Sequence, residues 1–403
     1  MTADTLLTVN AGSSTMKLAL FSIAGQTVTH RLRAVVDLLR DPLALRIRRG
    51  GSRHSHSLDL PTTADARTIM AAVLRCLADH ADLSGLRAVA HRVVHGGDLF
   101  PGPVRLDTEV IAGIEALTRL APLHQPQNLA LIRAAAGLRP DLLQVASFDT
   151  AFHGSMPEVT RRFALPREWF DRGVKRYGFH GLSYKYIAGV LARELPDAHR
   201  AVVAHLGSGA SLCAMEGGAS RDTSMGFSTL DGVPMATRCG ALDPGVILHM
   251  LAHEGQAHAD ISAMLYHRAG LLGLSGISGD SRVLLESSAA EAAEALQHFA
   301  LRIAGEVARL AASLSGLDVL VFTAGVGENQ PWVRQAVCSR LAWMGITLDP
   351  KANEANARQI NAPGSRIVVS VIPTDEEQIM AEESLAVLDD RASSDSLCER
   401  HAP

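Results

Sequence analysis

The stretch AVVAHLGSGASLCAM, residues 201–215, decides the fold because it repeats a pattern already present in TVNAGSSTMKLAL, residues 8–20. In each copy an apolar run meets a group of glycine, serine and other small residues and then resumes. That pattern predicts a strand, a tight turn and a second strand. His205 stands 195 residues after Asn10, and the matched pairs are Asn10 with His205, Gly12 with Gly207, Ser13 with Ser208, Ser14 with Gly209 and Ala19 with Ala214.

The turn in each copy is a candidate phosphate loop. Such turns leave backbone N–H groups unpaired around a concavity, and concavities of this kind bind phosphate. One glycine and serine turn by itself usually serves only to reverse the chain. Two copies, half a chain apart, predict two similar lobes that each contribute a loop to one phosphate chain.

Length and composition exclude several classes of protein. A chain of 403 residues exceeds one ordinary hydrophobic core and therefore predicts two domains. Apolar residues make up 47% and charged residues 20%, as in globular enzymes. The net charge of −4 argues against nucleic acid as a partner. No run of about 18 apolar residues occurs, so we expect no membrane-spanning helix and no membrane partner.

The cysteines point to a reducing compartment. They are five in number, widely scattered and without a Cys-x-x-Cys spacing, which supports neither a disulfide framework nor a zinc site. The first residues show no basic region ahead of an apolar run, so we expect no signal peptide. These features predict a cytoplasmic location.

Two charged side chains follow predicted strands. Arg92 comes just after an expected strand at 86–89, and it is either an ordinary surface charge or a fork for carboxylate or phosphoryl oxygens. Asp149 follows an expected strand at 145–148, at the edge where open α/β sheets bind ligands.

Two further candidates lie between residues 180 and 238. His180 stands between glycines before a predicted helix at 183–195, and the dipole at a helix N-terminus favours anions. Arg238 lies in a long turn-rich segment, residues 222–245, and long loops inside compact enzymes are usually functional.

The C-terminal third offers one more glycine turn and one predicted cap. TAGVGEN, residues 323–329, follows an expected strand at 318–322 and indicates another anion or nucleotide site, although a single Gly-x-Gly is weak by itself. Thr374 and Glu377 have the spacing of a capping box for a final helix, and Glu376 lies in the first turn of that helix.

Ten motifs, in order across residues 6–390, resemble the acetate and butyrate kinase family. They are VNAGSSTMK, AHRVVHGG, LAPLHQPQN, SFDTAFH, RYGFHGLS, VVAHLGSGAS, MATRCGALDP, SGISGDSR, FTAGVGEN and IPTDEE. The resemblance implies an α/β fold of the ribonuclease H-like, actin and sugar-kinase type. In that fold two duplicated lobes of mixed β-sheet, flanked by helices, surround an ATP cleft, in agreement with the internal repeat.

The resemblance implies a reversible, in-line phosphoryl transfer. ATP and Mg²⁺ or Mn²⁺ would phosphorylate acetate, giving acetyl phosphate and ADP. Three alternatives stay open: a propionate or butyrate kinase, a relative that takes the phosphoryl group from pyrophosphate, and a non-catalytic ATP-binding sensor. Family members are commonly homodimers, so a second copy of the chain is the expected protein partner.

Carried over by motif, the family's roles fall on residues of this chain. The implied catalytic residues are Arg92, Asp149, His180 and Arg238, and the implied Mg²⁺ ligands are Asn10 and Glu376. The implied substrate pocket is Arg92, Val94, Leu123, Phe179 and Thr229. The implied ATP-binding residues are Lys17, His205, Leu206, Gly207, Ser208, Gly209, Asp280, Ser281, Arg282, Gly325, Val326, Gly327, Glu328 and Asn329.

Elementary chemistry limits what Asp149 can do. A carboxylic acid has a pKa near 4, so acetate is already ionised at neutral pH and needs no base to become a nucleophile. We therefore expect Asp149 to orient Arg92 or Mg²⁺ rather than to abstract a proton. Carboxylate and triphosphate repel each other, so catalysis depends on positioning and on cations.

Four residues depart from the pattern of the family. Ser208 and Thr229 stand where the family usually has Asn and Pro, and Gly279 and Ala241 stand where Asn and Asp are common. Ser208 leaves open which molecule donates the phosphoryl group, and Thr229 lies in the segment that helps line the acyl pocket. One methylene is worth only about 1 to 3 kcal/mol in such a pocket, so propionate is a further expected substrate.

The expected domain boundaries follow from these assignments. Residues 1–148 form the N-terminal lobe, a C-terminal helix at 379–392 packs back on it, and residues 149–378 form the nucleotide-binding lobe. The polar end of the chain, residues 393–403, is expected to be disordered.

Overall fold

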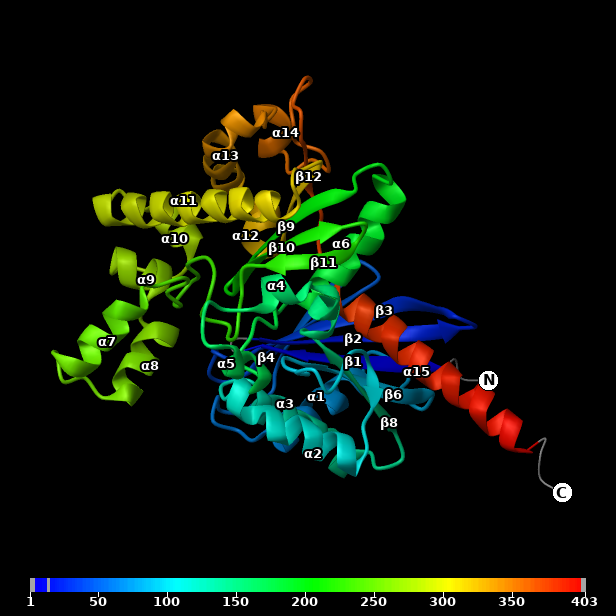
Figure 1. Ribbon diagram of the computed structural model, residues 1–403. Helices are drawn as coiled ribbons and strands as arrows, with labels where there is room; N and C mark the ends of the chain where they lie inside the picture. Colours follow the sequence, from blue (N-terminus) through cyan, green and yellow to red (C-terminus); the bar gives the residue numbers. More distant parts are fainter. Residues whose placement is uncertain (1–3, 13–14, 400–403) are drawn as a thin grey trace. The chain divides into compact units, whose positions relative to one another are not determined.

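The computed structural model describes residues 4–12 and 15–399, with side chains through Asp389 (Figure 1). Ser13 and Ser14 of the first predicted phosphate loop lie outside the described residues. The chain divides into two compact units. Unit 1 contains Met1–Phe152 and Asp375–Pro403, and unit 2 contains His153–Thr374.

Unit 1 is built on one mixed sheet of eight strands in the order β5-β4-β3-β2-β1-β6-β8-β7. β1, β6 and β8 are parallel neighbours, whereas β1 to β5 pair antiparallel in sequence order. The strands are β1 (Thr5–Ala11), β2 (Thr15–Ala24), β3 (Thr27–Asp37), β4 (Ala44–Arg49), β5 (Ser52–Ser57), β6 (Leu86–Val93), β7 (Val104–Arg105) and β8 (Leu143–Phe148).

Helices cover both faces of this sheet. Leu7 and Val9 of β1 share a buried core with α1 and α3, whereas Asn10, the residue after Val9, contacts α15. Because successive side chains of a strand point to opposite faces, α15 covers the face opposite α1 and α3. The helices are α1 (Ala66–Ala78), α2 (Thr108–Ala116), η1 (Leu117–Leu120), α3 (Gln125–Leu138) and α15 (Glu376–Glu399).

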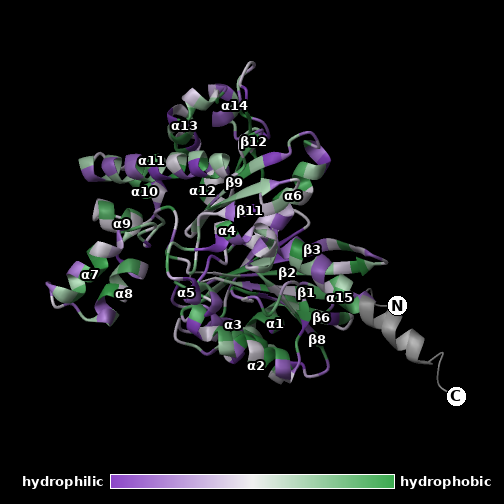
Figure 2. Ribbon diagram, viewed as in Figure 1, coloured by the Kyte–Doolittle hydropathy of each residue, from purple (hydrophilic) through white to green (hydrophobic). Residues whose placement is uncertain are grey.

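Unit 2 repeats the arrangement with five strands in the order β11-β10-β9-β12-β13. Of its central strands, β12 is buried throughout and β9 is buried from residue 201 onward, and both are largely apolar, as Figure 2 shows by their colour. The strands are β9 (Arg200–Leu206), β10 (Ala210–Glu216), β11 (Ala219–Thr223), β12 (Val319–Thr323) and β13 (Val368–Val371).

The two sheets confirm the predicted duplication. Unit 1 orders its strands β3-β2-β1-β6-β8 where unit 2 has β11-β10-β9-β12-β13, with antiparallel first pairs and parallel last pairs in both. The alignment of Ala19 with Ala214 is wrong by one residue. Asn10 pairs with Lys17, whereas His205 pairs with Ser211, so the second turn is one residue shorter than the first.

The remaining helices lie between residues 151 and 354. α11 packs on β9, β10 and β11, and α6 packs on β9. They are η2 (Ala151–Ser155), α4 (Glu158–Arg161), α5 (Arg167–Asp171), α6 (Gly181–Glu194), α7 (Pro244–Ala252), α8 (His258–His267), α9 (Gly270–Ser275), α10 (Ser281–Glu286), α11 (Ala290–Ser313), α12 (Ala324–Asn329), α13 (Pro331–Arg340), η3 (Ala342–Met344) and α14 (Pro350–Glu354).

The division of the chain differs slightly from the expected one. The units meet in sequence at residues 152 and 374 rather than at 148 and 378. Within the expected disordered tail at 393–403, the structure describes residues 393–399 as the end of α15, and residues 400–403 lie outside the described residues. In the part of the chain that the structure describes, no helix is both long and apolar enough to span a membrane.

Candidate active site

The first group of predicted site residues gathers at the carboxyl ends of three neighbouring parallel strands of unit 1. Asn10 is the penultimate residue of β1, Arg92 is near the end of β6, and Asp149 follows β8. The first turn of α15 adds Glu376 and Glu377. We call these five residues the carboxylate cluster.

The guanidinium of Arg92 is fixed by Asp149. Arg92 Nε donates to Asp149 Oδ1 at 2.9 Å and to Oδ2 at 3.1 Å, and Arg92 Nη2 donates to Oδ2 at 2.5 Å. The side chain of Asp149 is only 1% exposed and that of Arg92 14%. Burial alone would lower the pKa of Arg92, but the charges of Asp149 and Glu376 raise it above its usual value. Arg92 is therefore a permanently charged and oriented group.

Asn10 connects Arg92 to the carboxylates of α15. Arg92 Nη1 donates to Asn10 Oδ1 at 3.2 Å, and Asn10 Nδ2 donates to Glu376 Oε2 and to Glu377 Oε1, both at 2.8 Å. Lys17 lies directly across from Asn10 in the register of β1 and β2. Burial raises the pKa of Glu377, the charge of Lys17 opposes that rise, and the charge of Glu376 adds to it. The sequence did not single out Glu377 for this position.

The start of α15 differs from the predicted capping box. Asp375, not Thr374, caps the helix, because Asp375 Oδ1 accepts from the backbone N–H of Gln378 at 3.1 Å. Asp375 also contacts His30 at 3.0 Å and forms an ion pair with Arg33, both on β3. The capping-box prediction is therefore wrong, and the carboxylate of Glu377 is left to bind Asn10.

The donors of the carboxylate cluster fit Mg²⁺. Among the described side chains, no group of three or more His, Cys, Asp or Glu residues is arranged to hold a metal ion. Mg²⁺ does not require one, since it usually keeps several waters and binds one or two carboxylates together with substrate phosphates. Two adjacent carboxylates, the buried Glu376 and the half-buried Glu377, whose pKa is raised, are a place where a cation would be stabilised.

In unit 2, His180 occupies a backbone conformation that suits few residues. It is the N-cap of α6 with φ of +58°, and Gly178 two residues earlier has φ of +83°. A Cβ on Gly178 would lie 2.5 Å from the ring of His153, so only glycine fits there. Gly178 thus serves to turn the chain ahead of the predicted histidine.

A hydrogen-bonded group of side chains, the histidine cluster, fixes the ring of His180. His180 stacks on His205 with ring centroids 4.2 Å apart, and its Nδ1 lies 2.7 Å from Ser211 Oγ. Tyr184 Oη also contacts Ser211 Oγ at 2.5 Å, and His205 Nδ1 lies 2.9 Å from Ser183 Oγ. Sequence reasoning found both histidines but missed these hydroxyl partners, which carry no motif of their own.

Arg238 and His180 meet at the backbone of Gly209. A Cβ placed on Gly209 would lie 3.4 Å from Arg238 Nη2 and 3.5 Å from His180 Nε2. Arg238 Nη1 donates to the backbone oxygen of Thr229 at 3.1 Å. The glycine turn of the second repeat therefore faces two groups that can bind an anion.

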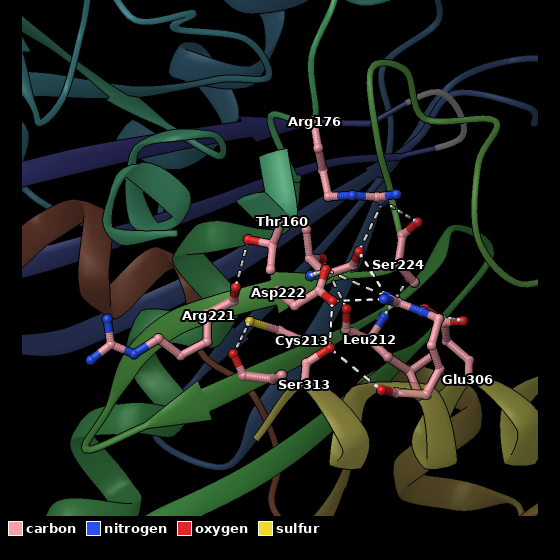
Figure 3. A network of polar contacts seen from close by, with 12 residues as sticks. Thr160, Arg176, Leu212, Cys213, Arg221, Asp222, Ser224, Glu306 and Ser313 are labelled. Atoms are coloured by element: carbon pink, nitrogen blue, oxygen red, sulfur yellow. Dashed lines mark hydrogen bonds and ion pairs between the residues drawn. The ribbon is translucent and has the colours of Figure 1, made fainter. Parts of the chain in front are cut away.

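A polar network holds the loops that carry these groups (Figure 3). Arg176 Nη1 donates to the backbone oxygens of Thr223 and Ser224 and contacts Asp231 at 3.3 Å. Arg309 of α11 binds Asp222 at 2.6 Å. Arg176 thus connects the segment that leads to His180 with the segment that leads to Arg238.

The predicted pocket residues fall in both units. In unit 1, Val94 is buried and donates its N–H to Asn128 Oδ1, while Leu123 is 46% exposed. In unit 2, Phe179 is buried, and its backbone oxygen lies 3.0 Å from His153 Nε2. Thr229 contributes its carbonyl to Arg238.

A pocket of about 290 Å³ adjoins the predicted nucleotide residues of unit 2. Arg282 and Asn329 line it, and the buried Ser281 beside it accepts from Gln330 at 2.7 Å. Asp280 caps α10 and also forms an ion pair with Arg282. The remaining lining residues are Leu285, Glu286, Gln330, Pro331, Trp332 and Glu354.

The segment 325–329 forms the short helix α12 rather than an open loop. Ala324, with φ of +64°, turns the chain between β12 and α12. Glu328 Oε1 accepts from the N–H of Ala324 at 2.8 Å and from that of Thr374 at 3.2 Å. Leu206 is buried in β9, and Gly325 and Val326 lie in the first turn of α12.

Two of the departures from the family pattern have structural consequences. Ser208 is exposed, and its backbone oxygen accepts from the N–H of Ala236, which connects the glycine turn to the segment of Arg238. A Cβ on Gly279 would lie 2.8 Å from the oxygen of Ala236, so a larger residue there requires a shift of that segment.

Comparisons with known proteins extend over nearly the whole chain. Residues 5–382 match the family described as the acetokinase family. The acetate kinase of Rhodopseudomonas palustris (strain TIE-1) is 47% identical over 388 residues, covering 94% of this chain and 97% of that protein. The acetate kinase of Nitrobacter hamburgensis is 44% identical over 404 residues, covering 98% and 99%.

Solved structures give the same picture. A propionate kinase from Francisella tularensis subsp. tularensis SCHU S4 superposes with a TM-score of 0.87 at 33% identity, covering 94% of this chain and 98% of that one. The acetate kinase of Porphyromonas gingivalis gives 0.84 at 36% identity, covering 96% and 100%. These likenesses confirm the predicted fold class.

Proposed function

The chain belongs to the acetokinase family, and we propose on that basis that it transfers the γ-phosphoryl group of ATP reversibly to acetate. The products would be acetyl phosphate and ADP. Within the structure, the observation that carries the proposal is the meeting of Arg238 and His180 at Gly209, because two anion-binding groups face a backbone without a side chain.

The chemistry needs cations more than a base. Acetate is ionised at neutral pH, and its approach to a triphosphate is opposed by charge repulsion. The transition state spreads charge over the equatorial oxygens of the phosphoryl group, which fixed cations stabilise. We assign this work to Arg92, Arg238 and His180, with Lys17 acting on the ATP phosphates.

Asp149 is proposed to act through Arg92. Both of its oxygens accept hydrogen bonds from the guanidinium, which supports an orienting role. A carboxylate held in this way keeps Arg92 in one rotamer, so the arginine needs no reorganisation when acetate binds.

Mg²⁺ is proposed to bind at Glu376 with the help of Asn10. The ion would supply positive charge to the phosphate oxygens of ATP. Asn10 holds the carboxylates of Glu376 and Glu377 in place through its amide N–H groups, and its oxygen is held by Arg92.

The nucleotide is proposed to bind in unit 2. The pocket beside Arg282 and Asn329 offers an apolar and polar lining for the adenosine. The glycine turn at 205–209 and the start of α12 offer backbone N–H groups for the phosphates.

A second candidate substrate is propionate. The likeness to a solved propionate kinase at a TM-score of 0.87 favours it, and Thr229 replaces a residue that helps line the family's acyl pocket. Pyrophosphate is the alternative phosphoryl donor, because Ser208 replaces the Asn that the family usually has in this glycine turn. The sensor alternative is disfavoured, since Arg92, Asp149, His180, Arg238 and Glu376 are all present.

A homodimer is proposed with α7 in its interface. α7 has no buried residue, although it is rich in apolar side chains. Val246, Leu248 and Leu251 are 36%, 64% and 44% exposed. Clustered exposed apolar residues mark interaction surfaces. Light scattering should give twice the mass of the chain, and Leu248→Glu should halve it. Leu301→Glu, on the exposed face of α11, is the matched control; a wild-type mass equal to one chain contradicts the proposal.

We also propose a cytoplasmic location, because the donor is ATP and Cys76, Cys213, Cys239 and Cys338 are free thiols.

The test of the activity is the formation of acyl phosphate, trapped as hydroxamate, from acetate, propionate or butyrate. Each acid is offered with Mg-ATP and, separately, with Mg-pyrophosphate. We expect the highest kcat/KM with acetate and ATP. A higher value with a longer acid or with pyrophosphate would reassign the substrate or the donor. No product with any pair would contradict the kinase proposal.

A further inference from the structure

Arg334 is the largest side chain that the described core buries completely, with 0% exposure. It projects from the first half of α13 and takes no part in the chemistry proposed above. Its Nε donates to Asn353 Oδ1 at 2.8 Å, and its Nη2 donates to the backbone oxygen of Asn353 at 2.7 Å and to Asn356 Oδ1 at 2.6 Å. Its Nη1 donates to the backbone oxygen of Gly327 at 2.8 Å.

The partners in these four hydrogen bonds are all neutral oxygens. Burial lowers the pKa of Arg334 to about 10, with Cys338 and Glu354 opposing that shift, so the guanidinium stays charged at neutral pH. A buried charge without a counter-ion among its hydrogen-bond partners is costly, unless several well-aligned bonds compensate it. The arrangement indicates that each of the bonds matters.

The hydrogen bond from Arg334 to the backbone oxygen of Gly327 has a clear physical reason. Gly327 lies in α12, whose last carbonyls lack partners within so short a helix. A cation at a helix C-terminus binds those carbonyls and interacts favourably with the helix dipole. Gly327 itself packs against β12, since a Cβ there would lie 3.3 Å from the carbonyl carbon of Phe322. Arg334 and β12 together fix α12 from two sides.

The same guanidinium joins elements that surround the pocket beside Arg282. Asn329 of α12, Pro331 and Trp332 of α13, and Glu354 of α14 all line that pocket. Asn353, the neighbour of Glu354, also donates its Nδ2 to the backbone oxygen of Pro331 at 2.9 Å. Figure 1 shows α13 and α14 side by side near β12.

We propose that Arg334 is a positioning residue for the nucleotide. It touches no substrate and acts by holding α12, α13 and α14 in the arrangement that forms the pocket. The inference rests on the proposed function, because it takes the pocket to be the adenosine site. It predicts that losing Arg334 weakens nucleotide binding while acetate binding is kept.

The test compares three variants. Arg334→Met removes all four hydrogen bonds at similar length, and Asn356→Gly removes one acceptor while suiting the backbone, whose φ is +51°. Arg340→Met is the matched control, since Arg340 lies on the same helix but bonds Ala336 and Gln297 away from the pocket. The readouts are the Kd for ADP by calorimetry and the KM values for ATP and acetate.

We expect Arg334→Met to raise the Kd for ADP and the KM for ATP about tenfold or more, and Asn356→Gly about threefold, as for lost buried hydrogen bonds. The KM for acetate should stay within about twofold, and Arg340→Met should change none of these values. Equal rises in both KM values, or an unchanged Kd in both test variants, overturn the inference.

Failure of the proposed function has a different signature. A wild-type protein that binds no ADP overturns the pocket assignment and this inference with it. A wild type that binds ADP but phosphorylates no carboxylate overturns only the proposed reaction, and the Kd series then still decides on Arg334. If Arg334→Met does not fold, Asn356→Gly carries the test, and an unchanged Kd in that variant counts against the inference.

Discussion

Both oxygens of Asp149 are bonded to Arg92, and this contact decides what the residue can contribute. A general base must reach the proton that it removes, but acetate carries none at neutral pH. The value of Asp149 therefore lies in the fixed direction of the guanidinium, with Asn10 as its second support.

We predict that Asp149→Asn lowers kcat about 100-fold, because an amide offers only one oxygen to the fork of Arg92 and adds a donor beside a cation. The pH–rate profile should keep its shape. In the double variant with Arg92→Ala, the two losses should not add, since both act through one guanidinium. Near-normal turnover in Asp149→Asn contradicts the orienting role.

At the scale of single residues, the sequence predicted the groups that carry a motif and missed those that do not. Arg92, His180 and Arg238 stand in recognisable segments, and the structure places each beside other polar groups. Ser211 and Arg334 act through partners that only the fold brings near. No spacing in the sequence could have indicated those contacts.

At the scale of elements, the start of α15 shows how tertiary contacts override a local signal. Thr374 and Glu377 have the spacing of a capping box, but Asp375 is held by His30 and Arg33 of β3 and caps the helix instead. The choice depends on β3, more than 330 residues earlier, which a local motif cannot reveal. It leaves Glu376 and Glu377 directed at Asn10.

We predict that Asp375→Ala costs about 2 kcal/mol of unfolding free energy, against about 1 kcal/mol for Asp107→Ala, which caps α2 in the same unit. Asp375 loses a cap and two cationic partners, whereas Asp107 loses only a cap. Denaturant unfolding followed by circular dichroism measures both. Equal costs would contradict a role for His30 and Arg33.

The difference in unfolding free energy between Asp375→Ala and Asp107→Ala should depend on pH with a definite sign. Burial would raise the pKa of Asp375, but the hydrogen bond from His30 and the charge of Arg33 outweigh it and lower the pKa below 3.8. Stabilisation by the ionised form is therefore complete above the unfolded pKa and is lost as the pH falls through the folded pKa. The extra loss of unfolding free energy in Asp375→Ala should thus be largest at pH 7 and should decrease in strong acid.

At the scale of the whole molecule, the sequence repeat predicted the duplicated sheets. Apolar strand segments and the glycine turn between them can both be recognised in a sequence. The sequence did not predict the one-residue difference in length between the two turns, because the register depends on which backbone groups pair. The outer strands β4 and β5 and the helices α7 to α9 have no counterpart in the repeat. Their places came only from the structure.

Acid should destabilise the molecule through its buried histidines. Burial lowers the pKa of His91, His95 and His153 to about 4 each. The unfolded state then binds more protons than the folded state between about pH 6.5 and 4, so stability rises with pH across that window. Above pH 6.5 this contribution is complete.

We predict that His91→Gln reduces the slope of unfolding free energy against pH by up to about 1.4 kcal/mol per pH unit within that window. His258→Gln, at an exposed position of α8, is the control and should leave the slope unchanged. Denaturant titrations at pH 7, 6, 5 and 4.5 give the slopes. The same slope in wild type and His91→Gln would show that His91 does not titrate as described.

The most direct measurement is the initial rate of acetyl phosphate formation from acetate and Mg-ATP by the wild type beside Arg238→Lys and Arg268→Lys. We predict turnover by the wild type, a loss of about 100-fold in Arg238→Lys, because an ammonium lacks the fork of a guanidinium, and no change in Arg268→Lys, an exposed control. No acetyl phosphate from the wild type, or full activity in Arg238→Lys, would contradict the account.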